Sequence, residues 1–310
     1  MTLRQFLTKR FFIDIGDPTS TILLVGSARS GTTWMQGILN CRNDHRILFE
    51  PFNSRRVPAI SGWRYRQYIR GSDESRFYKT VAQSILTGRI RYKWIDKYNT
   101  KFIASKRIIK DIRIPLSLWW LHKNWPSIPI IFLVRHPLSV IKSKLALDWS
   151  DELDEFISQK QFVDDYLQKH DWHSWSEANS FDRHLIQWCL ENFVPLCQFD
   201  NLNMLVVFYE DLCTRPFTEV ERIFDYLKRP PPGLDLVQDV VTKPSATSRK
   251  ESAVQKGLDF VDGWQHEPTD MDTRNFERIM ESFGLDILYG RGPYPLVKAD
   301  SVLSVMKPTR

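Results

Sequence analysis

Hydrophobic residues along the chain form short runs that alternate with segments of helical spacing. Four apolar runs, each ending in a polar turn, are typical of buried strands in a parallel sheet: 21–26, 106–110, 128–135 and 203–209. Helical periodicity occurs at 32–41, 75–87, 115–124, 137–147, 151–169, 180–200 and 216–228. Strands alternating with helices predict an α/β fold, a doubly wound parallel sheet flanked by helices in a single domain.

The predicted domain spans residues 20–290, between an N-terminal segment 1–19 and a C-terminal tail 291–310. A proline-rich break at 229–233 interrupts it, and the stretch from there to Trp264 shows no clear period. We therefore expect a long loop or lid after the break.

Composition limits the classes of protein that fit the chain. It has 310 residues, 42% of them hydrophobic, which is enough for one large core. Its longest strongly apolar run, 128–134, is too short for a membrane span of about 20 residues, and the N-terminus lacks the apolar core of a signal peptide. The four cysteines show neither metal-site spacing nor the density of a disulfide scaffold. We expect reduced thiols and a cytoplasmic protein.

The charge balance favours an anionic partner but not nucleic acid. The formal net charge is +6, yet 37 acidic residues are interspersed with 43 basic ones, without a dense basic block or a recognition-helix pattern. A solvated surface of mixed charge explains this balance best. The basic and aromatic sequence from Arg4 to Phe12 suits weak contact with a membrane surface, although we favour its packing on the domain. The sequence leaves the oligomeric state open.

A turn of small residues joins the first predicted strand to the first predicted helix: Gly26-Ser27-Ala28-Arg29-Ser30-Gly31-Thr32-Thr33. Such a turn exposes backbone N–H groups beside a helix N-terminus, whose partial positive charge favours phosphate. The spacing is that of a P-loop, except that Thr32 stands where the lysine belongs. A P-loop hydrolase also ends a second strand in a metal-binding acid, whereas Arg135 follows the strand here. The fold is thus expected to be P-loop-like without the lysine and acid of a triphosphatase.

The sequence from Arg29 to Trp34 resembles the loop with which sulfotransferases bind the 5′-phosphosulfate of 3′-phosphoadenosine 5′-phosphosulfate (PAPS). The resemblance implies that PAPS is the cosubstrate and that the loop holds its 5′ side through Arg29, Ser30, Gly31, Thr32 and Thr33. It also implies that Trp34 lies near the adenine, although a core position is the alternative for this side chain.

The resemblance extends to Arg135 and Ser143, since the family uses an arginine and a serine at this spacing to bind the 3′-phosphate. An arginine can hold phosphate through two parallel charge-assisted hydrogen bonds. Tyr209, within Tyr-Glu-Asp, resembles the tyrosine that borders the adenosine. Arg249 and Lys250 fall roughly where cytosolic members close over the 3′-phosphate, but a solvated basic loop explains them equally well because Glu251 replaces the family's glycine.

Sulfuryl transfer needs a group that removes the acceptor's proton. Cytosolic phenol and steroid sulfotransferases use a histidine in a Lys-x-His segment, and the comparable stretch here, 110–115, has none. Phe-Glu-Pro at 49–51 resembles the carbohydrate sulfotransferases, so Glu50 is the predicted base. We expect the apolar Phe49 and Phe52 to raise its pKa. The alternative is a carboxylate that only orients substrate or pairs with a nearby arginine, Arg55 or Arg56.

Positive charge is also needed on the departing phosphate oxygen. Lys110 ends a predicted strand on the ligand-binding side of the sheet, so with Arg29 it is predicted to supply this charge. A structural pair with Asp111 or another acid is the alternative for the lysine. No metal is required by this chemistry, and His170 and His173 lie in a polar loop without a convincing ligand cluster.

The predicted protein is therefore a PAPS-dependent sulfotransferase acting on a hydroxyl-bearing acceptor, namely a sugar, glycolipid or small molecule. One alternative is a P-loop kinase or NTPase, which would turn over ATP with magnesium. Another is a non-catalytic module that binds an adenosine bisphosphate or a polyanion and tolerates replacement of Glu50.

Overall fold

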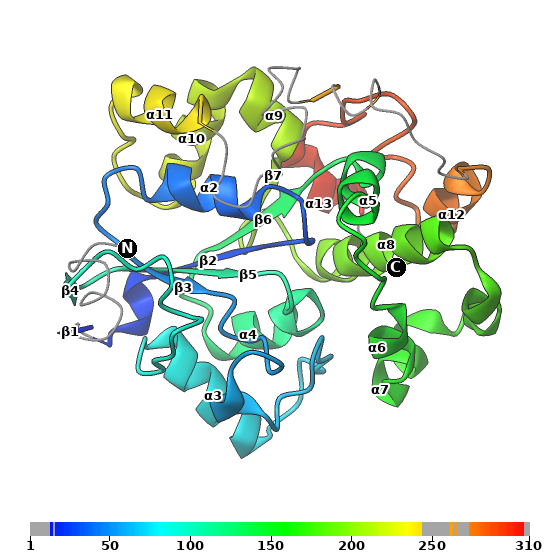
Figure 1. The fold of residues 1–310 in the computed structure, drawn as a ribbon, viewed down its shortest axis with the longest axis horizontal. Coiled ribbons are helices and arrows are strands. Elements are labelled where there is room, and N and C mark those ends of the chain that lie inside the picture. Colours follow the sequence, from blue (N-terminus) through cyan, green and yellow to red (C-terminus); the bar gives the residue numbers. More distant parts are fainter. Residues whose placement is uncertain (1–12, 15, 244–260, 263–264, 266–272, 307–310) are drawn as a thin grey trace.

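A five-stranded parallel sheet forms the centre of the computed structural model, which describes residues 13–14, 16–243, 261–262, 265 and 273–306. The strand order is β3-β5-β2-β6-β7, with β2 in the middle of the sheet (Figure 1). The strands are β3 (Arg46–Phe49), β5 (Arg107–Asp111), β2 (Thr21–Gly26), β6 (Ile130–Val134) and β7 (Leu205–Phe208). A second, two-stranded parallel pair joins β1 (Ile13–Asp14) to β4 (Ile103–Ala104).

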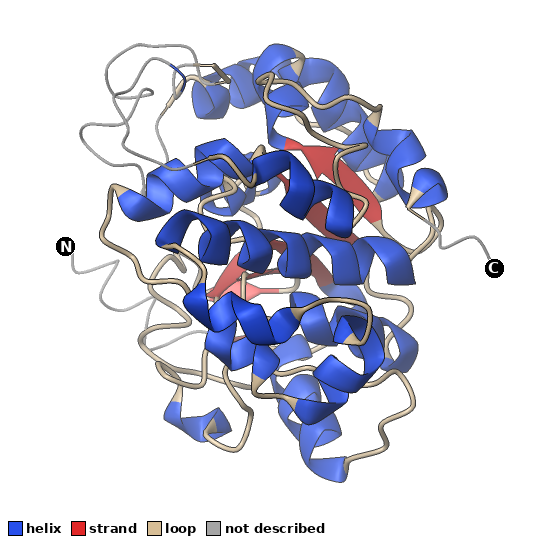
Figure 2. Cartoon of the chain, turned by 90° about the vertical axis from the view of Figure 1, so that its right-hand side faces the viewer, coloured by secondary structure: helices blue, strands red, loops and turns tan. Residues whose placement is uncertain are grey.

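Helices cover both faces of the sheet (Figures 1 and 2). They are α2 (Thr32–Leu39), α3 (Arg76–Leu86), α4 (Leu118–Asn124), α5 (Pro137–Leu145), α6 (Leu153–Ile157), α7 (Lys160–Phe162), α8 (Ser180–Gln198), α9 (Tyr209–Thr214), α10 (Pro216–Tyr226), α11 (Leu234–Val241), α12 (Phe276–Ser282) and α13 (Val302–Val305).

Alternate residues of each strand pack into two separate hydrophobic cores. In β2, Leu23 and Val25 face the larger core with α3, α4 and α8, and Ile22 and Leu24 face the smaller core with α2, α10 and α11. Since successive strand residues point to opposite faces, this division follows from the continuous apolar runs seen in the sequence. The predicted α/β, P-loop-like, doubly wound sheet in a single domain is confirmed.

The expected loop after residue 233 is wrong for 234–241, which form α11. This helix has only eight residues and buries Val237 alone, so its period is too short to stand out in the sequence.

The predicted helix over 151–169 is interrupted. Its break comes at Gln159, whose buried side chain accepts a hydrogen bond from the backbone N–H of Tyr68 (2.7 Å) and donates one to the carbonyl of Arg66 (2.9 Å).

β3 is an additional strand whose first residue is a fully buried arginine. Arg46 pairs with Asp14 at 2.8 Å and with Asp96 at 2.9 Å, which supplies the opposite charge that a buried guanidinium needs.

Within the part of the chain that the structure describes, no helix is long and apolar enough to cross a bilayer.

Candidate functional site

The turn between β2 and α2 is held in a conformation that depends on Gly31. This glycine has a φ of 93°, in the left-handed region, and precedes the first residue of α2. A Cβ atom added there would lie 2.6 Å from the ring of Tyr209, so a larger residue has no room. The Ser30 hydroxyl donates to the carbonyl of Ser27 at 2.7 Å, which closes the turn. The N-terminus of α2 therefore faces the loop, as an anion site requires.

The two segments predicted to bind the two ends of PAPS are in direct contact. Arg29 Nε donates to Ser143 Oγ at 3.0 Å, and Arg135 Nη1 donates to the carbonyl oxygen of Arg29 at 3.2 Å. Arg135 directly follows β6, the neighbour of β2, and Ser143 lies on α5. The parallel register thus brings the loop, the arginine and the serine to the carboxyl edge of the sheet.

Two aromatic rings stand beside this contact. The ring centroids of Trp34 and Tyr209 are 5.4 Å apart with their planes tilted by 58°, and the guanidinium of Arg135 lies 4.0 Å from the Tyr209 centroid. Trp34 Nε1 also donates to the carbonyl of Val240 on α11 at 3.4 Å. Burial raises the pKa of Tyr209, so its hydroxyl is neutral. Both rings are buried in the smaller core, which means that Trp34 has a packing role whatever else it contacts.

Glu210 is a residue whose role the motif alone did not reveal. Its carboxylate accepts the backbone N–H of His136 at 2.9 Å and the hydroxyl of Tyr289 at 2.8 Å. Burial raises the pKa of this carboxyl group. Because His136 directly follows Arg135, Glu210 ties the end of β6 to the end of β7 and positions the arginine. The side chain that follows Tyr209 in the motif therefore serves the geometry of the site.

Glu50 and Lys110 form a buried ion pair. Their Oε1 and Nζ atoms are 2.7 Å apart, and the backbone N–H of Glu50 donates to the carbonyl of Lys110 at 2.7 Å. Glu50 follows β3 with a φ of 45°, a left-handed conformation that is uncommon for glutamate, and Lys110 lies on the adjacent strand β5. Glu50 and Lys110 thus pair with each other. Arg55, the alternative partner of Glu50, pairs with Glu155 instead.

The expected rise in the pKa of Glu50 is wrong. Burial alone raises this pKa, but the nearby cations, above all Lys110, outweigh it and hold the pKa below its usual range. The other cations are Arg113 and Lys97. Phe49 does lie beside Glu50 in the chain, but Lys97 Nζ stands only 3.7 Å from its ring centroid, so the surroundings are cationic. Glu50 is therefore ionised at neutral pH.

Asp111, next to Lys110 on β5, has a raised pKa, in contrast to Glu50. Burial and the charge of Glu50 raise its pKa to about 6. Its two oxygens accept backbone N–H groups from Phe52 (2.9 Å) and Arg113 (2.7 Å). These bonds fasten the segment after Glu50 to the end of β5, so Asp111 stabilises the geometry of the site.

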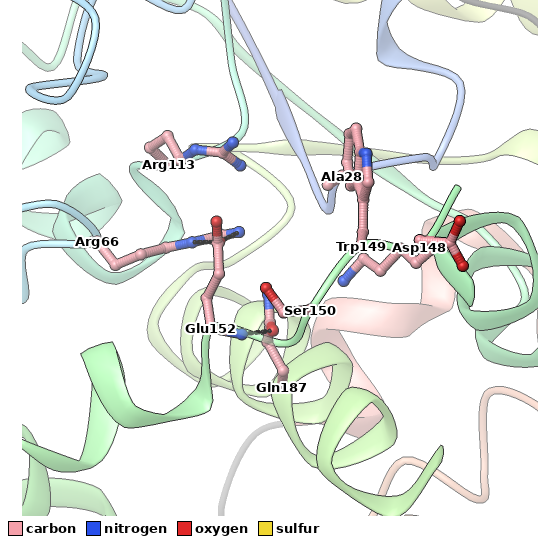
Figure 3. A pocket seen from close by; sticks show the side chains of 9 residues that line it. Ala28, Arg66, Arg113, Asp148, Trp149, Ser150, Glu152 and Gln187 are labelled. Carbon is pink, nitrogen blue, oxygen red and sulfur yellow. Dashed lines mark hydrogen bonds and ion pairs between the residues drawn. The ribbon is translucent and has the colours of Figure 1, made fainter. Parts of the chain in front are cut away.

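A cavity of about 280 Å³ adjoins the phosphate loop at Ala28 (Figure 3). Its walls are Ala28, Arg66, Arg113, Lys144, Asp148, Trp149, Ser150, Glu152 and Gln187. The exposed ring of Trp149 also stands 5.9 Å from the guanidinium of Arg29. The cavity therefore lies next to the predicted donor site but is lined by different residues.

Three further expectations concern the rest of the sequence. Arg249 and Lys250 lie outside the described residues. His170 stacks on Phe283 with ring centroids 4.5 Å apart. Among the residues that the structure describes, no group of three or more His, Cys, Asp or Glu side chains is arranged to hold a metal ion.

A doubly wound parallel sheet with a phosphate-type loop and cationic groups at its carboxyl edge is typical of α/β proteins that bind an anionic ligand. A model of the sulfotransferase family matches residues 21–232, which are most of the chain. The protein therefore belongs to the sulfotransferase family, whose members are enzymes that transfer sulfuryl groups. This confirms the resemblance found in the motifs.

Several solved structures of sulfotransferases are similar to this chain over most of its length. Mouse sulfotransferase SULT7A1 complexed with PAP is 16% identical, with 90% of this chain and 87% of that chain covered and a TM-score of 0.43. The sulfotransferase domain of the Synechococcus PCC 7002 olefin synthase is 15% identical, with coverages of 88% and 96% and a TM-score of 0.46. Retinol dehydratase with androsterone and PAP is 15% identical, with coverages of 94% and 86% and a TM-score of 0.44. No curated protein matches the chain.

Proposed function

We propose that this sulfotransferase transfers a sulfuryl group from PAPS to a hydroxyl group of a sugar, glycolipid or small molecule. The observation that carries the proposal is the contact of Arg29 with Ser143 (3.0 Å) and of Arg135 with the Arg29 carbonyl (3.2 Å). PAPS bears anionic groups at both its 3′ and its 5′ end, so it requires two neighbouring anion sites. Arginine guanidinium groups and a hydroxyl beside a helix N-terminus suit that requirement.

In this proposal the loop binds the 5′ side through Arg29, Ser30, Gly31, Thr32 and Thr33. Arg135 and Ser143 bind the 3′-phosphate, and Arg249 and Lys250 remain predicted contacts of the same phosphate. Trp34 and Tyr209 border the adenosine, where the aromatic surface of Tyr209 and the guanidinium of Arg135 already lie 4.0 Å apart. The bound donor supplies an activated sulfuryl group.

Glu50 accepts the proton of the acceptor hydroxyl in this proposal. The acceptor oxygen then forms a bond to sulfur while the bond from sulfur to the phosphate oxygen breaks, and 3′,5′-adenosine bisphosphate (PAP) leaves. Arg29 and Lys110 neutralise the negative charge that develops on the departing oxygen. Because the pKa of Glu50 is held below its usual range, the carboxylate is in the form that can accept a proton.

Lys110 links the two halves of this reaction. Its Nζ is 2.7 Å from Glu50 Oε1, and this contact lowers the pKa of the glutamate. If the lysine turns toward the departing oxygen, Glu50 loses its closest cation while its burial remains. Its pKa then rises, so Glu50 becomes a stronger base as charge develops on the leaving group.

The proposal is tested by calorimetric binding of PAP, without metal, to the native protein and to Arg135→Ala. We expect tight native binding that weakens about 100-fold in the variant, because charge-assisted hydrogen bonds to phosphate contribute roughly 1.5–3 kcal/mol each. Arg70→Ala is the control, since Arg70 is exposed and paired with Asp165 far along the chain from the loop. Absence of PAP binding together with binding of ATP and magnesium would favour a P-loop NTPase instead.

A further inference from the structure

The cavity beside the phosphate loop contains more buried positive charge than the proposed reaction uses. Its volume of about 280 Å³ is close to the lower end of the range for ligand pockets, roughly 300–1,000 Å³. Three of its lining residues, Arg66, Arg113 and Lys144, are cations. What the cavity can bind depends on which of these charges are already neutralised.

The guanidinium of Arg66 is already paired with other groups of the protein. Its guanidinium pairs with Glu191 at 2.7 Å and with Glu152 at 2.5 Å, and it also donates to the carbonyl of Ile112 at 2.8 Å. Glu152 in turn accepts the hydroxyl of Tyr65 at 2.6 Å. This network pairs the arginine with both carboxylates, so Arg66 is not available as the main contact of a ligand. Oε2 of Glu191 has no hydrogen-bond partner among the described residues, and the charge of Glu191 also acts on Lys144.

Lys144 is buried without such a partner. Its side chain is 2% exposed, and its Nζ has no hydrogen-bond partner among the described residues, although it lines the cavity. Burying an ammonium group is costly unless it is paired and hydrogen-bonded. Almost all buried polar groups in proteins have a protein or water partner, so an ammonium group with none among the described residues, at a cavity wall, suits a ligand that supplies the missing contact.

Arg113 is the second cation that faces the cavity. Its guanidinium extends toward the open space in Figure 3, and its buried Nε has no hydrogen-bond partner in the described part of the chain. It stands 5.0 Å from the ring centroid of Tyr65. Arg113 follows Lys110 by three positions, and its charge lowers the pKa of Glu50. A ligand held by Arg113 would therefore lie near the proposed base.

The acidic lining residues compensate these two cations only in part, because the charge of Glu152 acts on Lys144 and Arg113 but its ion pair is with Arg66. Glu152 belongs to the Arg66 network, and the carboxylate of Asp148 points away from Arg66 and Arg113 in Figure 3. Moreover, none of the residues proposed to hold the donor lines the cavity. This separates the cavity from the donor site and places it where an acceptor would approach.

We propose that the cavity binds an anionic group of the acceptor through Lys144 and Arg113, so that the substrate is a hydroxyl compound that already bears a carboxylate, sulfate or phosphate. This inference rests on the proposed sulfuryl transfer. The same anion chemistry could come from the sulfuryl end of the donor, and the test separates these two sources.

The test uses the native protein saturated with PAP, which lacks the sulfuryl group, and titrates it calorimetrically with inorganic sulfate. We expect sulfate to bind, and its affinity to fall at least about 10-fold in Lys144→Met and in Arg113→Gln. Lys123→Met is the matched control, because Lys123 is exposed on α4 and does not line the cavity. PAP affinity should stay within about twofold of native in all three variants.

Folding of the variants is checked by thermal unfolding. Lys144→Met removes no hydrogen bond of Nζ within the described residues, so the Tm should not fall by more than a few degrees. Arg113→Gln, a change at a partly exposed residue, gives an independent result if the first variant is unstable.

A second titration replaces PAP with a PAPS analogue whose bridging oxygen is a methylene group. Retained sulfate binding supports an acceptor site, whereas loss of binding assigns the cavity to the donor's sulfuryl group and overturns the inference. It is also overturned if sulfate fails to bind the PAP complex or binds the variants as well as the native protein. Those results leave the proposed function intact, while failure of PAP itself to bind removes both.

Discussion

The donor side and the cavity side of this site are assembled in different ways. The donor side consists of short segments that follow strands: the turn 26–33 with Trp34 after β2, Arg135 and Ser143 after β6, and Tyr209 after β7. The register of the parallel strands places them together. The cavity side combines Arg66, Arg113 and Lys144 with carboxylates from separate segments. Recognition of a nucleotide is therefore a property of local turns, whereas recognition of an acceptor depends on long-range charge pairing.

The largest effect on stability is expected at the cavity side, where one arginine compensates two carboxylates. Arg66→Met should lower the free energy of unfolding by about 3–5 kcal/mol, because it leaves Glu152 and Glu191 uncompensated. Urea denaturation measures this change. Arg64→Met is the control and should cost about 1 kcal/mol or less, since Arg64 is exposed. An equally small effect at Arg66 would show that the network does not hold this side together.

Catalysis is expected to depend on Glu50 without affecting the donor side. Glu50→Gln should lower kcat about 100-fold or more, the usual contribution of a general base, while PAP affinity remains within a few-fold of native. The assay follows PAP release from PAPS with methyl β-D-glucuronide, an anionic sugar with free hydroxyl groups, as the test acceptor. Glu74→Gln, at an exposed position, is the control. Undiminished turnover in Glu50→Gln would mean that another group removes the proton.

The pH dependence of Glu50 is expected to change when its ion pair is removed. In the native protein Lys110 holds the pKa of Glu50 below its usual range, so the carboxylate stays ionised until the pH falls below that range. In Lys110→Met the burial remains but the main opposing cation is gone, so the pKa should rise. A ¹³C NMR titration of the glutamate carboxyl groups, assigned with Glu50→Gln, measures the shift. A downward shift would contradict this account of the pair.

The smallest effect is expected at the ring beside Arg135. Tyr209→Leu should weaken PAP binding roughly fivefold, because it removes a cation–π contact of about 1 kcal/mol at 4.0 Å. Tyr209→Phe retains the ring and should bind PAP like the native protein. Calorimetry on both variants checks the difference, and equal losses in the two would instead point to the hydroxyl group.

Much of the fold is predictable from the chain alone, because apolar runs and helical periods are local patterns. The predicted strand 21–26 is confirmed, the predicted strand 128–135 contains β6 at 130–134, and the predicted helix starts at Pro137 and Pro216 are confirmed. β3 is a strand that the pattern did not predict, since it has four residues and begins with Arg46. Its burial depends on Asp14 and Asp96, which are close only in the folded protein.

The residues of the candidate site also fall into those that the sequence predicted and those that only the structure revealed. Arg29, Arg135 and Ser143 were predicted from their motifs, and the structure brings them into contact, although their roles in binding PAPS remain predictions. Glu210 lies in the Tyr-Glu-Asp motif, which did not predict its role, and no motif singled out Arg113 or Lys144. Each matters because of its surroundings in the folded protein. Glu210 accepts the backbone N–H of His136, and the charge of Arg113 acts on Glu50. Lys144 is buried at a cavity wall, where its Nζ has no hydrogen-bond partner among the described residues.

The sequence by itself determined the parallel α/β sheet, the phosphate-type loop and membership of the sulfotransferase family, because these depend on neighbouring residues and on backbone turns. The tertiary structure alone decided that Glu50 pairs with Lys110, and it therefore reversed the expected direction of the Glu50 pKa. It also decided that Lys144 is a buried cation at a cavity wall. A side chain's charge state and its unmet contacts depend on burial and on distant charges, and folding alone sets both.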